Sequence, residues 1–595
     1  MSEFHEIDIA TGTMSIQQRA DGCQIIDCTT PLGEYARCLT ERLVYWAEHD
    51  PNRILVSRRG SDGRWIKLSY SDVLKEVRAL AGGLLARGLS AEKPVMILSG
   101  NSIEHLLLAL ACQHVGIPYS PISTPYSLIS TDYGKLKHAY QVLTPGLIFA
   151  DDPKAYAPAI DALDTEVEVV FDLASLRSET NDVESAYQAV TGDTIAKFLF
   201  TSGSTGLPKA VVNTQRMICA NQEMIRSVFK FMQTEPPVIV DWLPWNHTFG
   251  GNHNVGLVIY NGGTLYIDDG KPTPAGIETT LTNLSEVAPS VYFNVPKGYE
   301  LLVDRLEHDE AVAKHFFSRL SMTFFAGAGL SQPVWDRLDA LAIKYTGKKV
   351  PMVTGLGATE TAPSALFASV EECASGVVGV PAPGVQLKLV PNDEKLEVRV
   401  KAPTITPGYW RNPEQTRQAF DDEDFYCLGD ALAYIDSDAP QRGFRFDGRV
   451  GEDFKLNTGT WVSVGPLRAA LINAFAPLVQ DVVITGHNEA YLGALVFPNL
   501  EACQAINPAI KDAKSLLGSP EVIAEFTAKL QAFDRTTTGS STRIKALRLL
   551  DVPPSIDAHE ITDKGSINQR AVLKTRSDLV DVIYQTIDDN LLIRL

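Results

Sequence analysis

The chain has 595 residues, a formal net charge of −19, 45% hydrophobic residues and 21% charged residues. A single hydrophobic core does not extend over such a length, so we expect at least two domains, and the composition excludes a disordered or fibrous protein. The acidic charge argues against a nucleic-acid partner and against an anionic membrane, because both bind basic surfaces.

The cysteines and the N-terminus bear on where the protein works. The eight cysteines form no CxxC pair, which favours reduced thiols over a disulfide framework. The first residues, MSEFHEIDIATGTMS, are acidic and lack the apolar run of a secretory signal peptide. We therefore predict a cytoplasmic protein that does not enter a membrane.

The N-terminal two thirds alternate between helical and strand-like patterns. Residues 1–35 are expected to be an irregular leader. From 36 to about 190, amphipathic helical patterns such as 70–88 alternate with apolar runs such as 93–100, and the alternation continues from 196 to about 365. Strands and helices in alternation predict an α/β fold with parallel sheets.

The pattern changes after residue 375. Residues 384–400 alternate about a turn and predict a β-hairpin, and 481–499 and 517–534 predict strands and a helix. We therefore predict a large N-terminal domain, 1–446, made of parallel-sheet α/β subdomains plus a β-rich subdomain. A small mobile α+β C-terminal domain, 447–595, is expected to follow it.

A segment rich in glycine and hydroxyl groups follows an apolar run, in FLFTSGSTGLPKAVVNT at 198–214. Glycines let a ligand approach the backbone, and N–H groups, hydroxyls and the Lys209 ammonium could converge on a phosphate. The segment is not a Walker loop, because Lys209 follows Pro208 and precedes Ala210. A polar surface turn is the alternative interpretation.

The string from Phe200 to Lys209 resembles the phosphate loop of the adenylate-forming superfamily, which includes acyl-CoA synthetases, nonribosomal adenylation domains and firefly-type luciferases. It departs from that signature at Ala210, where Gly is usual. Further motifs follow in the family's order over nearly the whole chain. The resemblance implies an AMP-binding adenylation domain, a mobile C-terminal domain, and the use of ATP, Mg²⁺ and coenzyme A.

The resemblance also implies roles for individual residues. His247 in LPWNHTFG would lie beside the acyl group, and Glu360 in TGLGATET would be catalytic and bind the metal. Leu356 stands where an aromatic residue usually stacks on adenine. The implied ATP- and AMP-binding residues are Thr201, Ser202, Gly203, Ser204, Thr205, Gly206, Lys209, Gly327, Ala328, Gly329, Leu356, Gly357, Thr359, Asp430, Arg449 and Lys455.

Family enzymes carry one more lysine, on the C-terminal domain, in a motif close to P-K-T-x-x-G-K-I-x-R. This chain has EITDKGSINQRAVLKTR, so Ser566 occupies the lysine position if Ile567 matches the motif's isoleucine. We predict Lys564 as the catalytic lysine and Lys574 as its rival. The alternative is that both are solvated charges beside a helix.

Four strings narrow the resemblance to feruloyl-CoA synthetases of the type that degrades lignin-derived aromatic acids: TPLGEYARCLTERLVYWAEHDPNR, MILSGNSIEH, GKLKHAYQVLTPGLIFADD and TDKGSINQRAVL. That family activates hydroxycinnamates such as ferulate, p-coumarate and caffeate. The implied acyl pocket contains His247, Phe249, Tyr292, Phe293, Asn294, Gly327 and Ala358. The aromatic residues in these segments could equally be plain core.

Polar residues near this pocket could meet a phenol or methoxy group: Asn246, Asn252, His253 and Asn294. Basic residues of the C-terminal domain could meet the phosphates of coenzyme A: Arg543, Lys545, Arg548, Arg570, Lys574 and Arg576. Two alternatives stay open, a CoA ligase for a benzoate-type or medium-chain acid and a non-catalytic acyl or nucleotide binder. A homodimer is possible.

Overall fold

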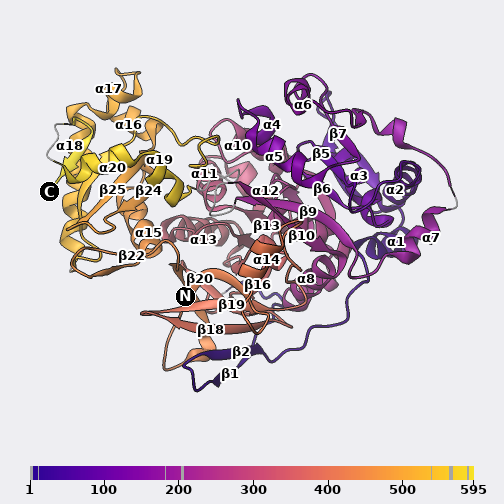
Figure 1. Cartoon of the computed structure of the whole chain (residues 1–595), viewed down its shortest axis with the longest axis horizontal. Coiled ribbons are helices and arrows are strands. Elements are labelled where there is room, and N and C mark those ends of the chain that lie inside the picture. Colours follow the sequence, from indigo (N-terminus) through magenta and orange to yellow (C-terminus); the bar gives the residue numbers. More distant parts are fainter. Residues whose placement is uncertain are drawn as a thin grey trace.

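The structure is a computed structural model, and it describes residues 4–10, 12–180, 182–202, 207–537, 539–561, 567–585 and 589–595. Figure 1 shows a large N-terminal part and a smaller C-terminal unit side by side. The mixed α/β architecture with a large and a small part confirms the predicted fold class. Within the described ranges, none of the helices combines the length and apolar character needed to cross a bilayer.

The first sheet is parallel apart from its edge strand β10, which runs antiparallel to β9. Its strand order is β10 (Pro208–Thr214), β9 (Ile195–Ser202), β6 (Tyr119–Pro121), β5 (Val95–Leu98), β7 (Leu147–Ala150) and β8 (Val169–Val170). The predicted phosphate loop therefore connects β9 to β10 at one end of this sheet.

A second sheet lies beside the first, with parallel strands β11 (Val238–Asp241), β12 (Thr264–Ile267) and β3 (Ile54–Arg59) and the antiparallel strand β4 (Trp65–Ser69). The third sheet is the largest, in the order β1 (Met14–Gln18), β2 (Gln24–Cys28), β18 (Gln386–Asn392), β19 (Lys395–Lys401), β20 (Tyr426–Tyr434), β21 (Phe444–Arg449), β17 (Val377–Pro381), β16 (Ser364–Phe367), β15 (Met352–Gly357), β14 (Met322–Phe325) and β13 (Val291–Asn294).

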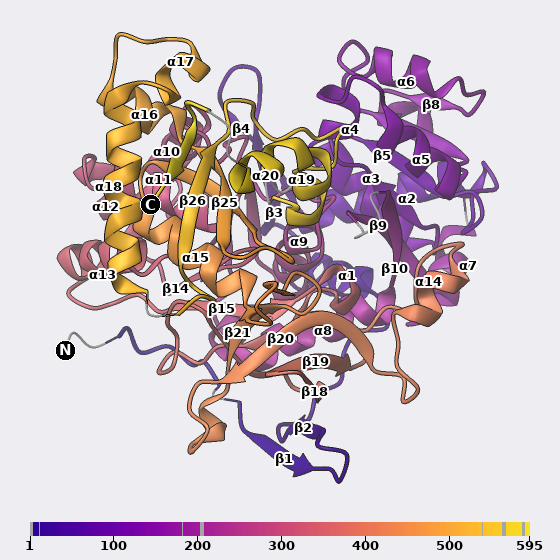
Figure 2. The same cartoon turned by 60° about the vertical axis from the view of Figure 1, so that its left-hand side comes forward.

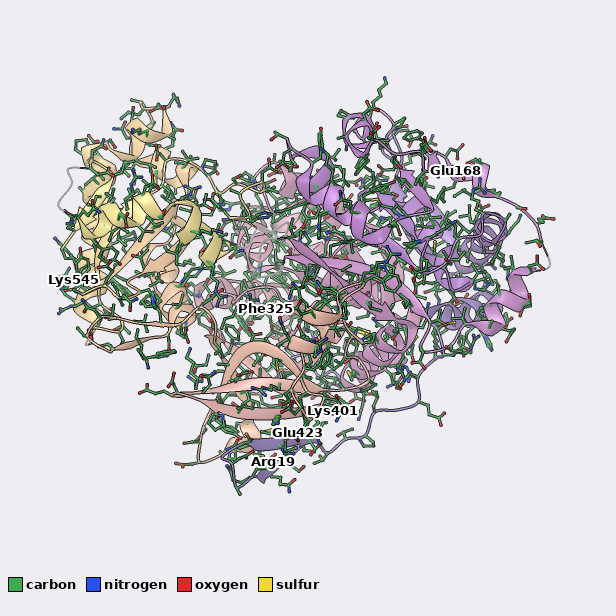
Figure 3. The ribbon with its side chains drawn as sticks, in the orientation of Figure 1. Arg19, Glu168, Phe325, Lys401, Glu423 and Lys545 are labelled. Atoms are coloured by element: carbon green, nitrogen blue, oxygen red, sulfur yellow. The ribbon has the colours of Figure 1, made fainter. Side chains whose placement is uncertain are left out.

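The prediction of an irregular leader is wrong for residues 14–28, because β1 and β2 form a hairpin that adds to the third sheet. Ile26 is fully buried and opposite Leu387 of β18. Arg19 in the hairpin forms an ion pair with Glu423 at 2.8 Å, and both lie at the lower edge of Figure 3. The strands are short, half of their residues are polar, and their partner β18 is far away in sequence, so local patterning did not predict them.

The helices of the N-terminal part cover the sheets. The longest of them, α2 (Tyr70–Leu85), begins at a capping box in which Ser69 and Asp72 exchange hydrogen bonds. The others are α1 (Leu39–His49), α3 (Ile103–His114), α4 (Pro125–Leu128), α5 (Gly134–Leu143), α6 (Ala157–Leu163), α7 (Asp182–Ala189), α8 (Gln215–Val228), α9 (Val255–Asn261), α10 (Gly276–Glu286), α11 (Pro296–Leu306), α12 (Glu310–Phe317), α13 (Gln332–Thr346) and α14 (Pro413–Gln418).

The C-terminal unit has its own hydrophobic core, built from residues beginning at Phe454. Its sheet contains β24 (Val479–Thr485), β25 (Leu492–Pro498), β26 (Ile544–Leu549) and β27 (Leu592–Arg594), and a small hairpin pairs β22 (Phe454–Lys455) with β23 (Trp461–Val462). Its helices are α15 (Val464–Phe475), α16 (Leu500–Ile506), α17 (Ala513–Leu517), α18 (Pro520–Thr536), α19 (Gln569–Thr575) and α20 (Ser577–Tyr584). The domain boundary predicted at residue 447 falls inside β21, so we propose that the second domain begins after Arg449.

The C-terminal unit touches the large part at several points. Thr131 donates from its hydroxyl to Asp557 at 3.1 Å, and Lys135 donates to the carbonyl of Ile556 at 2.6 Å. Figure 2, which brings the C-terminal unit forward, shows α19 and α20 on the side of this unit next to α4. These contacts hold the segment before α19 against the first sheet's subdomain.

A buried ion pair anchors the connector between the two parts. Lys395 of β19 contacts the Asp453 carboxylate and donates to the Asp447 carbonyl. The two paired side chains are 5% and 0% exposed, so neither charge is solvated by water when its partner is lost.

We expect Lys395→Met to lower the free energy of unfolding by about 3 kcal/mol, because it leaves the Asp453 carboxylate buried without its cation. Differential scanning calorimetry would show this as a lower transition temperature. The double variant Lys395→Met, Asp453→Leu should recover most of the loss, since an apolar pair of similar volume needs no counter-charge.

Arg64, whose side chain is 88% exposed and paired with Asp62, offers a matched control. Arg64→Met should change the free energy of unfolding by less than about 1 kcal/mol. Equal transition temperatures for the single and double Lys395 variants would contradict the proposed anchoring.

Candidate active site

One large cavity, with a volume of about 3320 Å³, lies where the three sheets of the N-terminal part face the C-terminal unit. Phe325, labelled near the centre of Figure 3, is part of its wall. The cavity brings together most of the site residues predicted from the sequence: Thr201, Lys209, His247, Phe249, Gly327, Ala328, Gly329, Leu356, Gly357, Ala358, Thr359, Glu360, Asp430 and Arg449.

Some predicted site residues do not line this cavity. Tyr292 is buried behind it against Phe316, at 5.2 Å between ring centroids, and the amide of Asn294 donates to the Tyr292 hydroxyl. Phe293 is also buried and lies one layer behind Phe249. These three belong to β13, an edge strand of the third sheet that helices cover, so their side chains serve the core. Lys455 lies outside the cavity too, with its ammonium over the Trp461 ring.

Other predicted residues fall outside the described part of the chain. They are Gly203, Ser204, Thr205 and Gly206 of the phosphate loop and Lys564 of the C-terminal motif. Ser202 belongs to β9 by its backbone. On the far side of the loop, β10 carries Lys209 into the cavity wall.

Asp430 and Arg449 lie opposite each other on β20 and β21. The guanidinium is 3.5 Å from the carboxylate. Burial raises the pKa of Asp430 to about 6, and the cation of Arg449 opposes this rise. Asp430 is 7% exposed, whereas Arg449 is largely exposed to the cavity, so the pair offers an anionic acceptor beside a cationic donor.

Glu360 accepts a hydrogen bond from a tyrosine that the sequence analysis did not predict as a site residue. The hydroxyl of Tyr409 donates to the Glu360 carboxylate at 3.1 Å, and Tyr426 lies 3.3 Å from the same hydroxyl. Burial raises the pKa of both tyrosines, so each keeps its proton. The Lys209 ammonium lies 4.6 Å from the centre of the Tyr409 ring. Tyr409 lies outside the motifs identified in the sequence, whereas Tyr426 directly precedes the CLGD segment that ends at Asp430.

The residues present fit a Mg²⁺ ion at Glu360. Mg²⁺ in nucleotide sites is usually bound by one or two carboxylates, with waters and substrate phosphates as its other ligands. Glu360 supplies one such carboxylate on the cavity wall, which the basic Lys209 also lines. Within the described residues, no group of three or more His, Cys, Asp or Glu forms an all-protein metal cage.

His247 and Phe249 are placed by an unusually tight packing of backbone. Residues Phe249–Asn254 form a π-helix, η3, a conformation often found at functional sites. Gly250 and Gly251 lie so close to the carbonyls of Leu243 and Trp245 that a Cβ atom at either position would collide with them. The two glycines therefore let η3 pack against the 243–245 loop, and this packing keeps His247 on the cavity wall.

The basic residues expected to meet coenzyme A do not form one free cluster. Arg576 is buried and paired with Glu560 at 2.7 Å, and Arg548 is buried beside Asp589. Lys545 lies at the outer edge of the C-terminal unit in Figure 3 and is not among the residues that line the cavity. Arg543 is paired with Asp534, and Arg570, whose Nε donates to the Gly451 carbonyl, is the member of this set that lines the cavity.

Comparison with known proteins gives the family. Residues 43–410 match the model of the AMP-binding enzyme family, and residues 454–588 match the C-terminal domain of AMP-binding enzymes. The chain therefore belongs to the AMP-binding enzyme family, which confirms the superfamily predicted from the phosphate loop and the motifs that follow it.

Named relatives extend over most of the chain. A long-chain-fatty-acid–CoA ligase of Mycobacterium bovis is 22% identical, over 91% of this chain and 96% of that protein. A 4-coumarate–CoA ligase-like protein of Arabidopsis thaliana is 28% identical, over 68% of this chain and 72% of that protein. The ATP-bound MatB of Rhodopseudomonas palustris shares the fold, with a TM-score of 0.67 at 21% identity over 91% of this chain and 99% of MatB.

If Asp430 accepts hydrogen bonds from ribose hydroxyls, adenosine binding should depend on pH. We expect the affinity to be constant above about pH 7 and to fall as the pH drops through about 6, because protonation removes the charged acceptor. Isothermal titration with adenosine isolates this effect, since adenosine carries no phosphate that titrates in the same range.

Asp430→Asn should bind adenosine about tenfold more weakly at pH 7.5, the loss expected for a hydrogen bond to a charged group. Its affinity should show no inflection near pH 6. The same inflection in both proteins would assign the pH dependence to another group.

Proposed function

We propose that this chain is an ATP-dependent acid–CoA ligase that forms an acyl-adenylate and then an acyl-CoA thioester, acting on ferulate and related hydroxycinnamates such as p-coumarate and caffeate. The observation that carries the proposal is that Lys209, Glu360 and the Asp430–Arg449 pair line a single cavity. These groups suit phosphates, a divalent cation and ribose hydroxyls. ATP and coenzyme A are then co-substrates, and Mg²⁺ accompanies ATP.

In the first half-reaction an oxygen of the carboxylate substrate bonds to the α-phosphorus of ATP, and pyrophosphate leaves. The reactants are both anions, so the site must offset their repulsion with positioned cations and N–H donors. Lys209 supplies one cation, and its place over the Tyr409 ring limits its freedom. Mg²⁺, when bound at Glu360, would neutralise phosphate charge.

In the second half-reaction the thiol sulfur of coenzyme A bonds to the acyl carbon. The bond from that carbon to the AMP oxygen breaks, AMP leaves as an anion, and the thiol loses its proton. The cavity extends between the two parts of the chain, where Asn568 and Arg570 of the C-terminal unit form its wall. This extension offers coenzyme A a route to the acyl group, with Arg570 as a cation along it.

We propose Lys564 rather than Lys574 as the catalytic lysine of the C-terminal unit. Ile567, Asn568 and Arg570 line the cavity, and Lys564 is close to them in sequence. Lys574 lies on α19 and is absent from the described wall of the cavity. Its role would therefore require a different placement of this helix.

Two observations support an aromatic acid as the substrate. Phe249 and Phe324 line the cavity with His253, which gives flat apolar surface beside His247. The Arabidopsis relative named above is a 4-coumarate–CoA ligase-like protein. A second candidate is a long-chain fatty acid, favoured by the relative that covers most of this chain. The eight unpaired cysteines suit the reducing cytoplasm, where we propose that this ligase works.

Tyr409→Phe should raise the Mg²⁺ concentration needed for half-maximal adenylation about tenfold, because Glu360 loses the hydrogen bond that orients it. The variant keeps the aromatic ring that the Lys209 ammonium contacts. Pyrophosphate release measured against Mg²⁺ at saturating ATP would show the shift. A change in the requirement for ATP alone would contradict an action through Glu360.

The direct test mixes the purified protein with ATP, Mg²⁺, coenzyme A and ferulate, and follows pyrophosphate release together with thioester absorbance. We expect both signals, and we expect Lys564→Ala to reduce pyrophosphate release by about 100-fold or more. Lys574→Ala, the matched control, should stay close to the unaltered protein. The same assay is repeated with a long-chain fatty acid and with other aromatic acids in place of ferulate. A fatty acyl thioester without any aryl-propenoyl thioester would select the second candidate, and no pyrophosphate with any of these acids would overturn the ligase function.

A further inference from the structure

His253 is a buried polar residue on the wall of the cavity that the reaction described above does not use. It belongs to η3 and is 1% exposed. Its ring meets the edges of Phe249 and Phe293, at 5.5 and 5.2 Å between ring centroids, and lies 5.3 Å from Phe324. Three phenylalanine rings therefore fix the orientation of the imidazole.

The hydrogen bonds of His253 define which of its nitrogens carries the proton. Nδ1 lies 2.9 Å from the Asn254 side-chain oxygen, and because an amide oxygen accepts, Nδ1 must donate. Burial lowers the pKa of His253 to about 4, so the ring is neutral near pH 7. Nε2 is then a bare acceptor, and it has no hydrogen-bond partner among the described residues.

The neighbouring polar residues differ from His253 in this respect. Asn252 donates to Asn213 at 2.8 Å, and Asn294 donates to a tyrosine hydroxyl; neither side chain lines the cavity. Trp245 lines the cavity, and its indole N–H has no partner within the described ranges, but this group is a donor and cannot accept a hydrogen bond from a hydroxyl. Of these residues, His253 alone combines an unpaired acceptor with a place on the cavity wall.

We propose that His253 Nε2 accepts a hydrogen bond from a hydroxyl group on the acyl part of the substrate, and that it thereby selects phenolic acids over acids without such a donor. The inference rests on the proposed ligase function and goes further, because it assigns the recognition of the phenol to one atom. A buried acceptor left unpaired disfavours binding of a hydrocarbon group, whereas a phenol O–H pairs with it. Sites built around such a bond discriminate strongly against analogues that lack the hydroxyl.

The test compares acids that differ in this hydroxyl alone. The ratio of kcat/KM for p-coumarate to that for cinnamate should be at least about tenfold in the unaltered protein. In His253→Phe the ratio should fall to about 1, because the p-coumarate hydroxyl loses its acceptor and cinnamate no longer leaves a buried acceptor unpaired. His253→Gln, which retains an acceptor oxygen, should restore part of the preference. A thermal transition close to that of the unaltered protein, measured by differential scanning calorimetry, shows that each variant is folded.

A measurement on the unaltered protein tests the inference even if the His253 variants do not fold. 4-Methoxycinnamate keeps an oxygen in the same position but has no proton to donate, so the unaltered protein should use it about as poorly as cinnamate. An undiminished ratio in His253→Phe, or equal use of p-coumarate and 4-methoxycinnamate, would overturn the inference and leave the ligase function standing. If no aryl-propenoyl thioester forms, the proposed substrate class fails, and the role of His253 fails with it.

Discussion

The hydrogen bond from Tyr409 to Glu360 joins segments that are distant in the chain, and the geometry of the site depends on it. Glu360 follows β15, Tyr409 precedes α14, and Lys209 reaches the same tyrosine ring from β10. The Glu360 carboxylate and the Lys209 ammonium thus both contact the Tyr409 side chain, without forming a direct ion pair with each other. Each charge stays available to a ligand, while the tyrosine, which keeps its proton, limits the motion of both.

Other polar groups around the cavity are also held in place by their neighbours. Asp430 is buried, and its partner Arg449 is left open to the cavity, so the pair is only partly neutralised. Two glycines let η3 pack against the backbone of the 243–245 loop, and three phenylalanine rings hold His253. Because such groups are not free to rearrange, a bound ligand meets an electrostatic field that is already in place.

Sequence patterns predicted this architecture where the signal was local. Alternating helices and strands gave the α/β class, and the motif residues from Lys209 to Arg449 were brought to one cavity. The patterns did not predict elements and residues whose place depends on tertiary contacts. The short strands β1 and β2 form because β18 is beside them, Tyr292 belongs to the core because helices cover β13, and Tyr409 lies outside the motifs identified in the sequence. Such residues are defined by neighbours in other helices and strands, which lie outside a local sequence window.

The N-terminal hairpin also has a protective role. As the outermost strands of the largest sheet, β1 and β2 cover the backbone donors and acceptors along β18. A chain that began after Cys28 would leave β18, a strand of 7 residues, as the edge of the sheet, and such an exposed edge is a template for strands of other molecules. A segment far from the cavity would then determine whether the protein stays monodisperse in solution. Tags or cleavage sites placed near the N-terminus would therefore affect aggregation and not the catalytic reaction.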